Sequence, residues 1–302
     1  METEVFDKIR SVKEAVKLIP DGSSVAVSGF GVTRCPISLV HEMIRAEKRN
    51  LTILETIGSL DADLLVGAGC VKKIVYGGGS LEPPIGPLNR VNEAIVQKEV
   101  EAEEYSGTSM CFKFLAGALG IPYIPIKSLL GSDLLPPLIR KGVVKVEKCP
   151  FTGETFVLLQ AVNPDFALIH AQRADAEGNV IIYGARWDNK ELAFASKTVI
   201  VTVEEIVDSS LIRSEASNVV IPSYRVHTII HVPFGAHPTG VYKYYDYDRE
   251  HLEYYVKLSR EKETFKKYLD EYVFSVENHM EYLKKIGVEK LLKLRADPLL
   301  GY

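Results

Sequence analysis

The chain has 302 residues, of which 46% are hydrophobic and 25% are charged. These proportions are globular, and they exclude a wholly disordered, collagen-like or low-complexity chain. The 36 Lys and Arg residues against 40 Asp and Glu residues give a formal net charge of −4. That balance excludes the basic surface of a protein that binds nucleic acid or an anionic membrane. The length favours one large α/β domain with an appendage.

The sequence carries no sign of export or membrane insertion. Residues 1–10 alternate in charge and lack the apolar stretch of a secretory signal. The longest apolar segment, residues 114–126, contains two prolines and is too short to span a bilayer. The four cysteines include no Cys-x-x-Cys pair. We therefore expect free thiols, no metal site and a soluble protein of the reducing cytoplasm.

The N-terminal part of the chain alternates short apolar runs with helical segments. Continuous apolar strands that alternate with helices indicate a parallel sheet covered on both faces. We therefore expect an α/β fold with an open, mostly parallel sheet. The expected strands are residues 24–28, 51–56, 73–76, 100–104 and 123–126, and the expected helices are residues 36–46, 88–98 and 107–119.

The middle of the chain and its C-terminal part follow different patterns. Residues 143–147 and 155–159 flank a Pro/Gly turn, which indicates an antiparallel hairpin insertion. Apolar runs then predict strands at residues 166–172, 180–183, 198–203, 219–221 and 228–232, with a helix at 190–196. From residue 242 the pattern predicts amphipathic helices. We therefore divide the chain into a core, residues 1–241, and a C-terminal helical extension packed on it, residues 242–302.

Three glycine-containing loops follow expected strands. Residues 28–34 (SGFGVTR) depart from a dinucleotide fingerprint because Arg34 takes the third glycine position, and no P-loop lysine follows. This loop either exposes backbone N–H groups to a ligand or is a tight turn. Residues 77–84 form a second loop, either a site loop or a surface linker. At the third, Ser106 or Thr108 either caps the next helix or helps to stabilise an oxyanion.

Two histidine-containing segments are weaker candidates. Residues 170–179 bring His, Arg, Asp and Glu around one turn, but no Gly-x-Ser-x-Gly nucleophile accompanies them and their spacing fits no strong metal pattern. His231 and His237 are six residues apart, which is weak support for a metal site. We interpret the first segment as a turn with buried polar partners and residues 231–238 as a rigidly packed loop.

Several of these segments together resemble a known family. Residues 21–31 (DGSSVAVSGFG), followed by Pro36, are similar to the α-subunit signature of class I coenzyme A transferases, with Ser28 and Arg34 in place of two glycines. Residues 149–154, 170–179, 204–207 and 233–238 resemble the branch that contains the A subunit of glutaconate CoA-transferase. The resemblance covers residues 5 to 240. It implies the sheet shared by CoA transferases and ribose-phosphate isomerases.

The resemblance implies covalent catalysis by a glutamate that attacks an acyl-CoA thioester. In the family this glutamate lies in the β subunit, in a Ser-Glu-Asn-Gly-like motif. The one Glu-Asn pair here, Glu277-Asn278, is followed by His279 in a charged C-terminal segment, so the nucleophile is absent from this chain. The implied enzyme is a heteromer with a β subunit. It has coenzyme A as a substrate, no permanently bound cofactor and no metal.

The resemblance also assigns substrate-binding positions in this chain. The first glycine loop shapes the floor near the acyl group, and the second loop borders the acyl substrate. Arg34 is expected near the mouth, where it either pairs with the distal carboxylate of a dicarboxylyl-CoA such as glutaconyl-CoA or is a surface or intersubunit residue. Ser106 replaces a glutamine of related transferases. The substrate-binding candidates are Gly29, Phe30, Gly31, Arg34, Ser80, Ser106 and Gly107.

Two other functions stay open at this stage. The first is hydrolysis or ring cleavage of a CoA thioester, in which a carboxylate of this chain acts as a base; Glu82, Glu103 and Glu104 are the candidates. The second is a non-catalytic ligand-binding or sensor protein, or a sugar-phosphate isomerase-like protein, because these share the sheet. A phosphosugar site needs a Lys/Asp/Glu cluster on these loops, and the sequence shows none.

Overall fold

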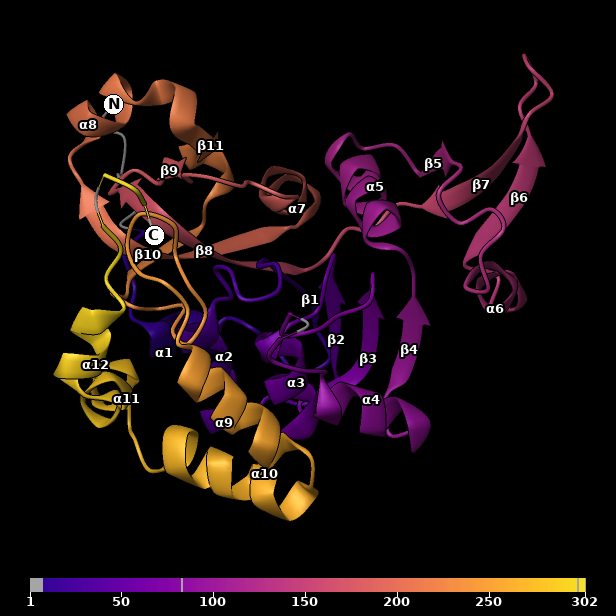
Figure 1. Cartoon of the computed structure of the whole chain (residues 1–302). Helices are drawn as coiled ribbons and strands as arrows, with labels where there is room; N and C mark the ends of the chain where they lie inside the picture. Colours follow the sequence, from indigo (N-terminus) through magenta and orange to yellow (C-terminus); the bar gives the residue numbers. More distant parts are fainter. Residues whose placement is uncertain (1–7, 83, 298, 302) are drawn as a thin grey trace.

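The main sheet runs through the body of the molecule (Figure 1). The computed structural model describes residues 8–82, 84–297 and 299–301. The sheet contains nine strands, and the neighbours β12-β10-β8-β1-β2-β3-β4 pair in parallel. Two short strands, β9 and β11, extend it in antiparallel fashion beside the far half of β8. The strands are β1 (Ser24–Val27), β2 (Leu51–Glu55), β3 (Val71–Tyr76), β4 (Glu101–Glu104), β8 (Phe166–Asp175), β9 (Val180–Ile181), β10 (Thr198–Val207), β11 (Val219–Ile221) and β12 (Thr228–His231).

The strand order reverses between β1 and β8. From β1 the chain adds β2, β3 and β4 on one side, and it later returns to place β8 against the other side of β1. β10 and β12 then extend the sheet in the opposite direction. The expected mostly parallel α/β architecture is therefore confirmed. The order of the strands leaves a gap between the covering helices where β1 and β8 meet.

Helices cover both faces of the sheet, and the alternating side chains of each strand supply two cores. On β1, Val25 and Val27 face the core shared with α2, α3 and α4, while Ala26 faces the core shared with α5 and α7. The helices are α1 (Val12–Lys17), α2 (Ile37–Arg45), α3 (Leu60–Gly67), α4 (Asn89–Val96), α5 (Gly107–Ala118), α7 (Asn189–Ala195) and α8 (Ser209–Ser214).

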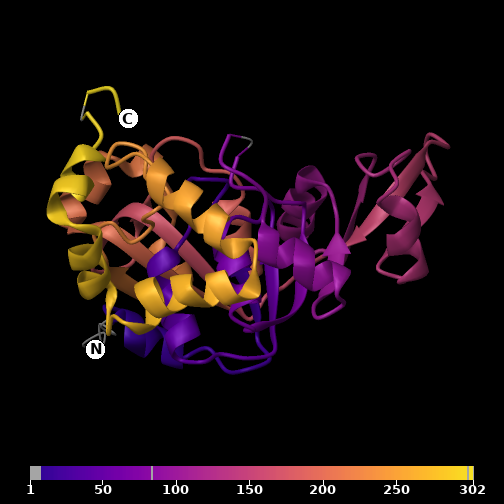
Figure 2. The same ribbon diagram turned by 60° about the horizontal axis from the view of Figure 1, so that its bottom comes forward.

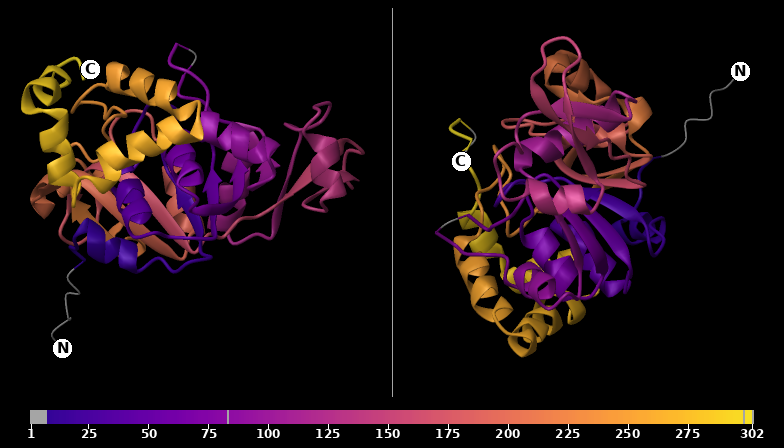
Figure 3. Two further views of the ribbon diagram at one scale, coloured as in Figure 1. Left: turned by 90° about the horizontal axis from the view of Figure 1, so that it is seen from below. Right: turned by 90° about the vertical axis from the view of Figure 1, so that its right-hand side faces the viewer.

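A small antiparallel sheet projects from the body beyond α5 (Figures 1 and 3). Its order is β5 (Tyr123–Ile126), β7 (Thr155–Gln160) and β6 (Val144–Lys148), with α6 (Leu135–Arg140) beside it. The predicted hairpin is confirmed. The prediction that residues 123–126 join the main sheet is wrong, because β5 pairs with β7. Pro125 has no N–H to donate, which suits the edge position of β5.

Four helices form the C-terminal part of the chain, and the first two pack on the α2–α4 face of the main sheet (Figure 2). They are α9 (Arg249–Ser259), α10 (Lys262–Leu269), α11 (His279–Ile286) and α12 (Val288–Lys293), with a π-helical turn over Asp270–Phe274. Leu252, Tyr255 and Phe265 join the same core as α2 and α3. The Tyr255 hydroxyl donates to Asp63 Oδ2 at 2.7 Å. The amphipathic pattern predicted these buried faces.

Sequence patterning did not identify α3. Every residue from Leu60 to Val66 is buried, including Asp61 and Asp63. A helix that is buried all round has no polar face and therefore no 3.6-residue periodicity to detect. Asp63 accepts a hydrogen bond from the Val91 amide at 2.8 Å, which ties α3 to α4.

Two further expectations concern targeting. Of the N-terminal segment 1–10, the structure describes only residues 8–10. In the part of the chain that the structure describes, no helix combines the length and apolar character needed to cross a membrane.

Neutral histidines line the contact between the C-terminal helices and the core. His237 bonds to Tyr282 at 2.7 Å and to Asp248 at 3.1 Å, and His251 bonds to Tyr268 at 2.8 Å. Burial lowers the pKa of His251 and of His279 to about 3, and it lowers the pKa of the fully buried His41 well below its ordinary value. These rings therefore stay uncharged in the folded protein at neutral pH.

We expect the folded protein to lose stability as the pH falls below the ordinary histidine pKa of 6.5. Below that pH the histidines of the unfolded chain bind protons, whereas the buried rings of the folded protein do not. Each such ring therefore lowers the free energy of unfolding by about 1.4 kcal/mol per pH unit. Urea unfolding at about pH 7.5 and about pH 5.5 measures this slope. His279→Asn should reduce the slope, because it removes one of these buried rings. An unchanged slope in His279→Asn would contradict the assignment.

Candidate functional site

Two loops face each other where the strand order reverses. One leaves β1 at residues 28–36, and the other joins β9 to α7 at residues 182–188. The Phe30 ring stacks on the Trp187 indole, with centroids 3.9 Å apart and ring planes 7° from parallel. Open α/β sheets bind ligands at the carboxyl ends of strands at such a reversal. This edge is therefore the candidate site.

The first glycine loop is closely packed at two backbone positions. Gly29 has φ +137°, and a Cβ there would lie 2.8 Å from Cys35 Sγ. Gly31 has φ +55°, and a Cβ there would overlap the Glu82 carboxyl group. The Ser59 hydroxyl donates to the Gly31 carbonyl from the loop after β2. The first and second glycine loops therefore touch at Gly31 and Glu82.

The loops after β2, β3 and β4 meet through their backbones. Gly58 donates its N–H to the Gly78 carbonyl at 2.9 Å. A Cβ on Gly77 would overlap the Thr56 carbonyl and the backbone of Gly107. Ser106 is the N-cap of α5, because its hydroxyl accepts the Ser109 amide at 3.2 Å. The predicted cap is confirmed, and Gly107, which follows it, lies beside Gly77 of the second glycine loop.

Arg34 is not near the mouth, because only 2% of the residue is exposed. Its guanidinium donates to Asn189 Oδ1 at 3.0 Å and to the Ala185 carbonyl, and it lies near Asp188. Burial lowers the pKa of Arg34 to about 10. The expected mouth position is wrong because the loop before α7 folds over the side chain and takes up its donors.

The three candidate bases lie in different surroundings. Glu82 is half-buried against Gly31, and its amide donates to the Ser80 hydroxyl at 3.2 Å. Glu103 points elsewhere, because its carboxylate pairs with Lys73 at 2.5 Å. Glu104 is exposed at the end of β4. Glu82 is therefore the candidate base that lies next to the first glycine loop.

Three buried carboxyl groups near this edge were not identified from the sequence. Glu55 ends β2, and burial, together with Asp61, raises its pKa well above the ordinary value. Burial also raises the pKa of Asp61, to about 6, and raises that of Asp188. The Thr56 hydroxyl donates to Asp188. An acid at the end of a mainly apolar strand was the available signal for Glu55, since strand ends form the crevice.

Several buried polar atoms at this edge have no hydrogen-bond partner among the described residues. They are Ser28 Oγ, both carboxyl oxygens of Glu55, Asp61 Oδ1 and Asn189 Nδ2. Ser28 lies on the loop that leaves β1, and Asn189 directly follows the loop that faces it. Unpaired buried groups are costly, and they often mark sites that meet water or a ligand.

A pocket of about 240 Å³ opens beside the Phe30–Trp187 stack. We call it the α5–α7 pocket, because those helices and the residues just before α7 form its walls. The Trp187 side of the pocket leads to the first glycine loop, and Cys111 lies 4.0 Å from Thr56 at the end of β2. Its lining residues are Cys111, Phe112, Leu115, Trp187, Asp188 and Glu191.

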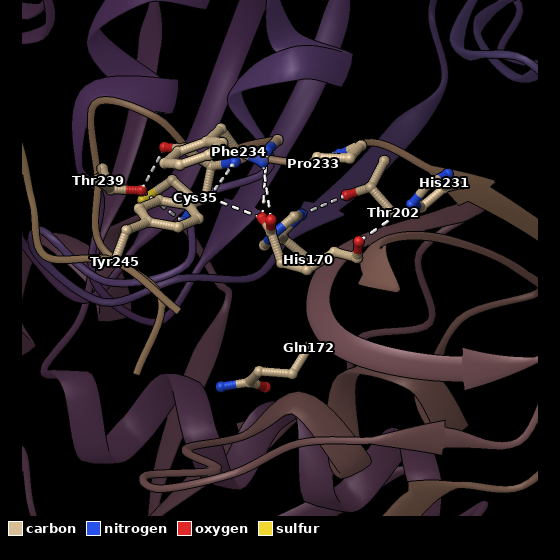
Figure 4. Close-up of polar contacts among 12 residues, drawn as sticks. Cys35, His170, Gln172, Thr202, His231, Pro233, Phe234, Thr239 and Tyr245 are labelled. Atoms are coloured by element: carbon tan, nitrogen blue, oxygen red, sulfur yellow. Dashed lines mark hydrogen bonds and ion pairs between the residues drawn. The ribbon is translucent and has the colours of Figure 1, made fainter. Parts of the chain in front are cut away.

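The histidine segments are structural. His170 and Tyr245 both bond to the buried Glu204 carboxylate at 2.8 Å, and the Phe234 amide donates to it at 2.7 Å. Figure 4 shows His170 between Thr202 and the loop that carries Phe234. Asp175 accepts the turn amides of Gly178 and Asn179. Both interpretations, a turn with buried partners and a packed loop, fit these contacts. Within the described ranges no group of three or more His, Cys, Asp or Glu residues could hold a metal.

Two curated proteins resemble this chain along almost its whole length. The A subunit of the 3-oxoadipate CoA-transferase of Pseudomonas knackmussii is 35% identical over 287 residues, which cover 94% of this chain and 99% of that protein. The A subunit of the glutaconate CoA-transferase of Acidaminococcus fermentans is 32% identical over 311 residues, which cover 98% and 97%.

Solved structures agree with this similarity. The crystal structure of glutaconate coenzyme A-transferase from Acidaminococcus fermentans matches with a TM-score of 0.91, at 32% identity and over 98% of each chain. A variant of the decarboxylase AibA/AibB matches with a TM-score of 0.75, also at 32% identity, over 88% of this chain and 100% of that chain. The family model described as coenzyme A transferase matches residues 9–231. This chain therefore belongs to the coenzyme A transferase family.

Proposed function

We propose that this chain is the α subunit of a heteromeric CoA-transferase, which moves coenzyme A between an acyl-CoA and a carboxylic acid. The observation that carries the proposal is the Phe30–Trp187 contact across the strand-order reversal, beside a pocket and a glycine loop of the family signature. The two relatives described above are both named as A subunits of CoA-transferases. Their names support a partner β subunit for this chain.

The reacting carboxylate belongs to the partner in this proposal, because the chain lacks a Ser-Glu-Asn-Gly-like motif. That glutamate attacks the thioester carbonyl, the C–S bond breaks, and CoA thiolate leaves behind a mixed anhydride. The thiolate then attacks the glutamyl carbonyl and releases the acyl group as a carboxylate. The acceptor acid takes the CoA from the glutamyl thioester by the reverse of these two steps.

This chain supplies the other wall of the site. Gly29, Phe30 and Gly31 form the floor beneath the acyl group, and the two glycines, both at positive φ, leave room for Cys35 and Glu82 to pack against this loop. Ser80 borders the acyl group from the second loop. Ser106 and Gly107 begin α5, a helix of 12 residues whose N-terminal N–H groups favour a developing negative charge.

Coenzyme A is a substrate in this proposal, and no permanently bound cofactor or metal is required by the chemistry. We place the enzyme in the cytoplasm, where free thiols persist.

A competing function is supported by one observation. The decarboxylase AibA/AibB variant has the same fold at 32% identity, so the fold also accommodates a reaction other than transfer. In hydrolysis or ring cleavage of a CoA thioester, Glu82 is the base of this chain that lies against the first glycine loop.

We expect the chain to be inactive alone and active with its β subunit. Incubation of the complex with acyl-CoA and borohydride should reduce one partner glutamate to the alcohol, which peptide mass spectrometry detects. The chain without its partner is the control. Transfer or hydrolysis by the lone chain, or loss of activity in Glu82→Gln without any labelled partner glutamate, would favour the competing function.

We expect Gly31→Ala to lower kcat/KM about tenfold or more, because the added methyl displaces the floor and the Glu82 carboxyl group. Gly131→Ala is the matched control: Gly131 also has positive φ, at +78°, but no heavy atom lies within 4 Å of its Cβ position. Both variants should lose stability by about 1–2 kcal/mol from backbone strain. Equal kcat/KM in the two variants would show that the first glycine loop is not part of the site.

A further inference from the structure

The α5–α7 pocket has an apolar wall and an acidic wall. Phe112, Leu115 and the Trp187 ring form the apolar wall. Asp188 and Glu191 contribute the two carboxyl groups, and none of the described residues that line the pocket carries a positive charge. Asp188 is buried, while Glu191 is half-buried on the first turn of α7. Any group that enters this pocket therefore meets carbon atoms and carboxyl oxygens.

Arg34 cannot neutralise a ligand here without breaking existing bonds. Its guanidinium is bound to Asn189 Oδ1 and to the Ala185 carbonyl, and these contacts hold both ends of the segment that carries Trp187. Arg34 has φ +53° and Trp187 has φ +43°. Two strained residues are retained where the surrounding contacts fix them. Arg34 is thus a positioning residue for the Trp187 wall.

We propose that the α5–α7 pocket takes the acyl chain of the thioester, and that the preferred chain is short and uncharged at its far end. The inference rests on the proposed function and names its substrate class. A chain of a few carbon atoms suits about 240 Å³. A distal carboxylate would face Asp188 and Glu191 with no free cation on the lining, and like charges at close range disfavour binding.

Trp187 makes the proposal testable, because it is the single tryptophan of the chain. The full chain is titrated with two thioesters of N-acetylcysteamine, pentanoyl and glutaryl, which differ at the far end by a methyl group against a carboxylate. The pentanoyl thioester should change Trp187 emission at a concentration at least about tenfold lower. Equal affinities, a preference for glutaryl, or no change with either thioester would overturn the proposal.

Reversing the charge of Glu191 tests whether the acidic wall of the pocket causes this preference. Glu191→Lys should shift the ratio of the two affinities toward glutaryl by about tenfold. Glu263→Lys is the matched control, since Glu263 is exposed on the first turn of α10. If Glu191→Lys does not fold, Glu191→Gln should give a smaller shift in the same direction. An unchanged ratio in a folded Glu191 variant would overturn the proposal.

CoA transfer by the complex with the β subunit is measured separately. Higher kcat/KM with glutaryl-CoA than with pentanoyl-CoA would overturn the substrate class and leave the transferase function in place. Absence of transfer from every donor would reject the transferase function, while the fluorescence titration still reports what the pocket binds.

Discussion

The strand-order reversal between β1 and β8 is the constraint on which the rest of this structure depends. A parallel strand needs a crossover helix, and successive crossovers carry the chain away from β1 in one direction and away from β8 in the other. The carboxyl ends of these two strands are therefore left without a covering helix. The first glycine loop and the segment before α7 close this gap through Phe30, Trp187 and Arg34.

The closure places carboxyl groups where water is excluded. Glu55 ends a buried strand, Asp61 lies in the first turn of a helix without an exposed face, and Asp188 directly precedes α7. Burial raises the pKa of all three. Burial in a medium of low dielectric constant disfavours the charged form of each of these acids.

Much of the sheet could be predicted from the sequence, because buried parallel strands appear as short, mainly apolar runs such as residues 24–28 and 51–56. The small hairpin was predicted from its Pro/Gly turn. The helix α3 was not, since burial on all sides removes its periodicity. Residues 123–126 were assigned to the wrong sheet, because an apolar run does not indicate which strand it pairs with.

The site was predictable only in part. The glycine loops and the Ser106 cap follow from local chemistry, because strand ends, glycines and capping hydroxyls have recognisable patterns. Trp187 lies in a segment without periodicity, and its contact with Phe30 joins residues far apart in the chain. The burial of Arg34 likewise depends on Asn189 and Ala185, which no local pattern connects to it.

The projecting sheet of β5, β6 and β7 enters and leaves the body at adjacent points, where the Ala161 amide donates to the Pro122 carbonyl at 3.0 Å. Everything between these two points can lengthen, shorten or change its surface without altering the order of the main strands. A change in the length of the arm therefore leaves the loops that meet at β1 and β8 in place.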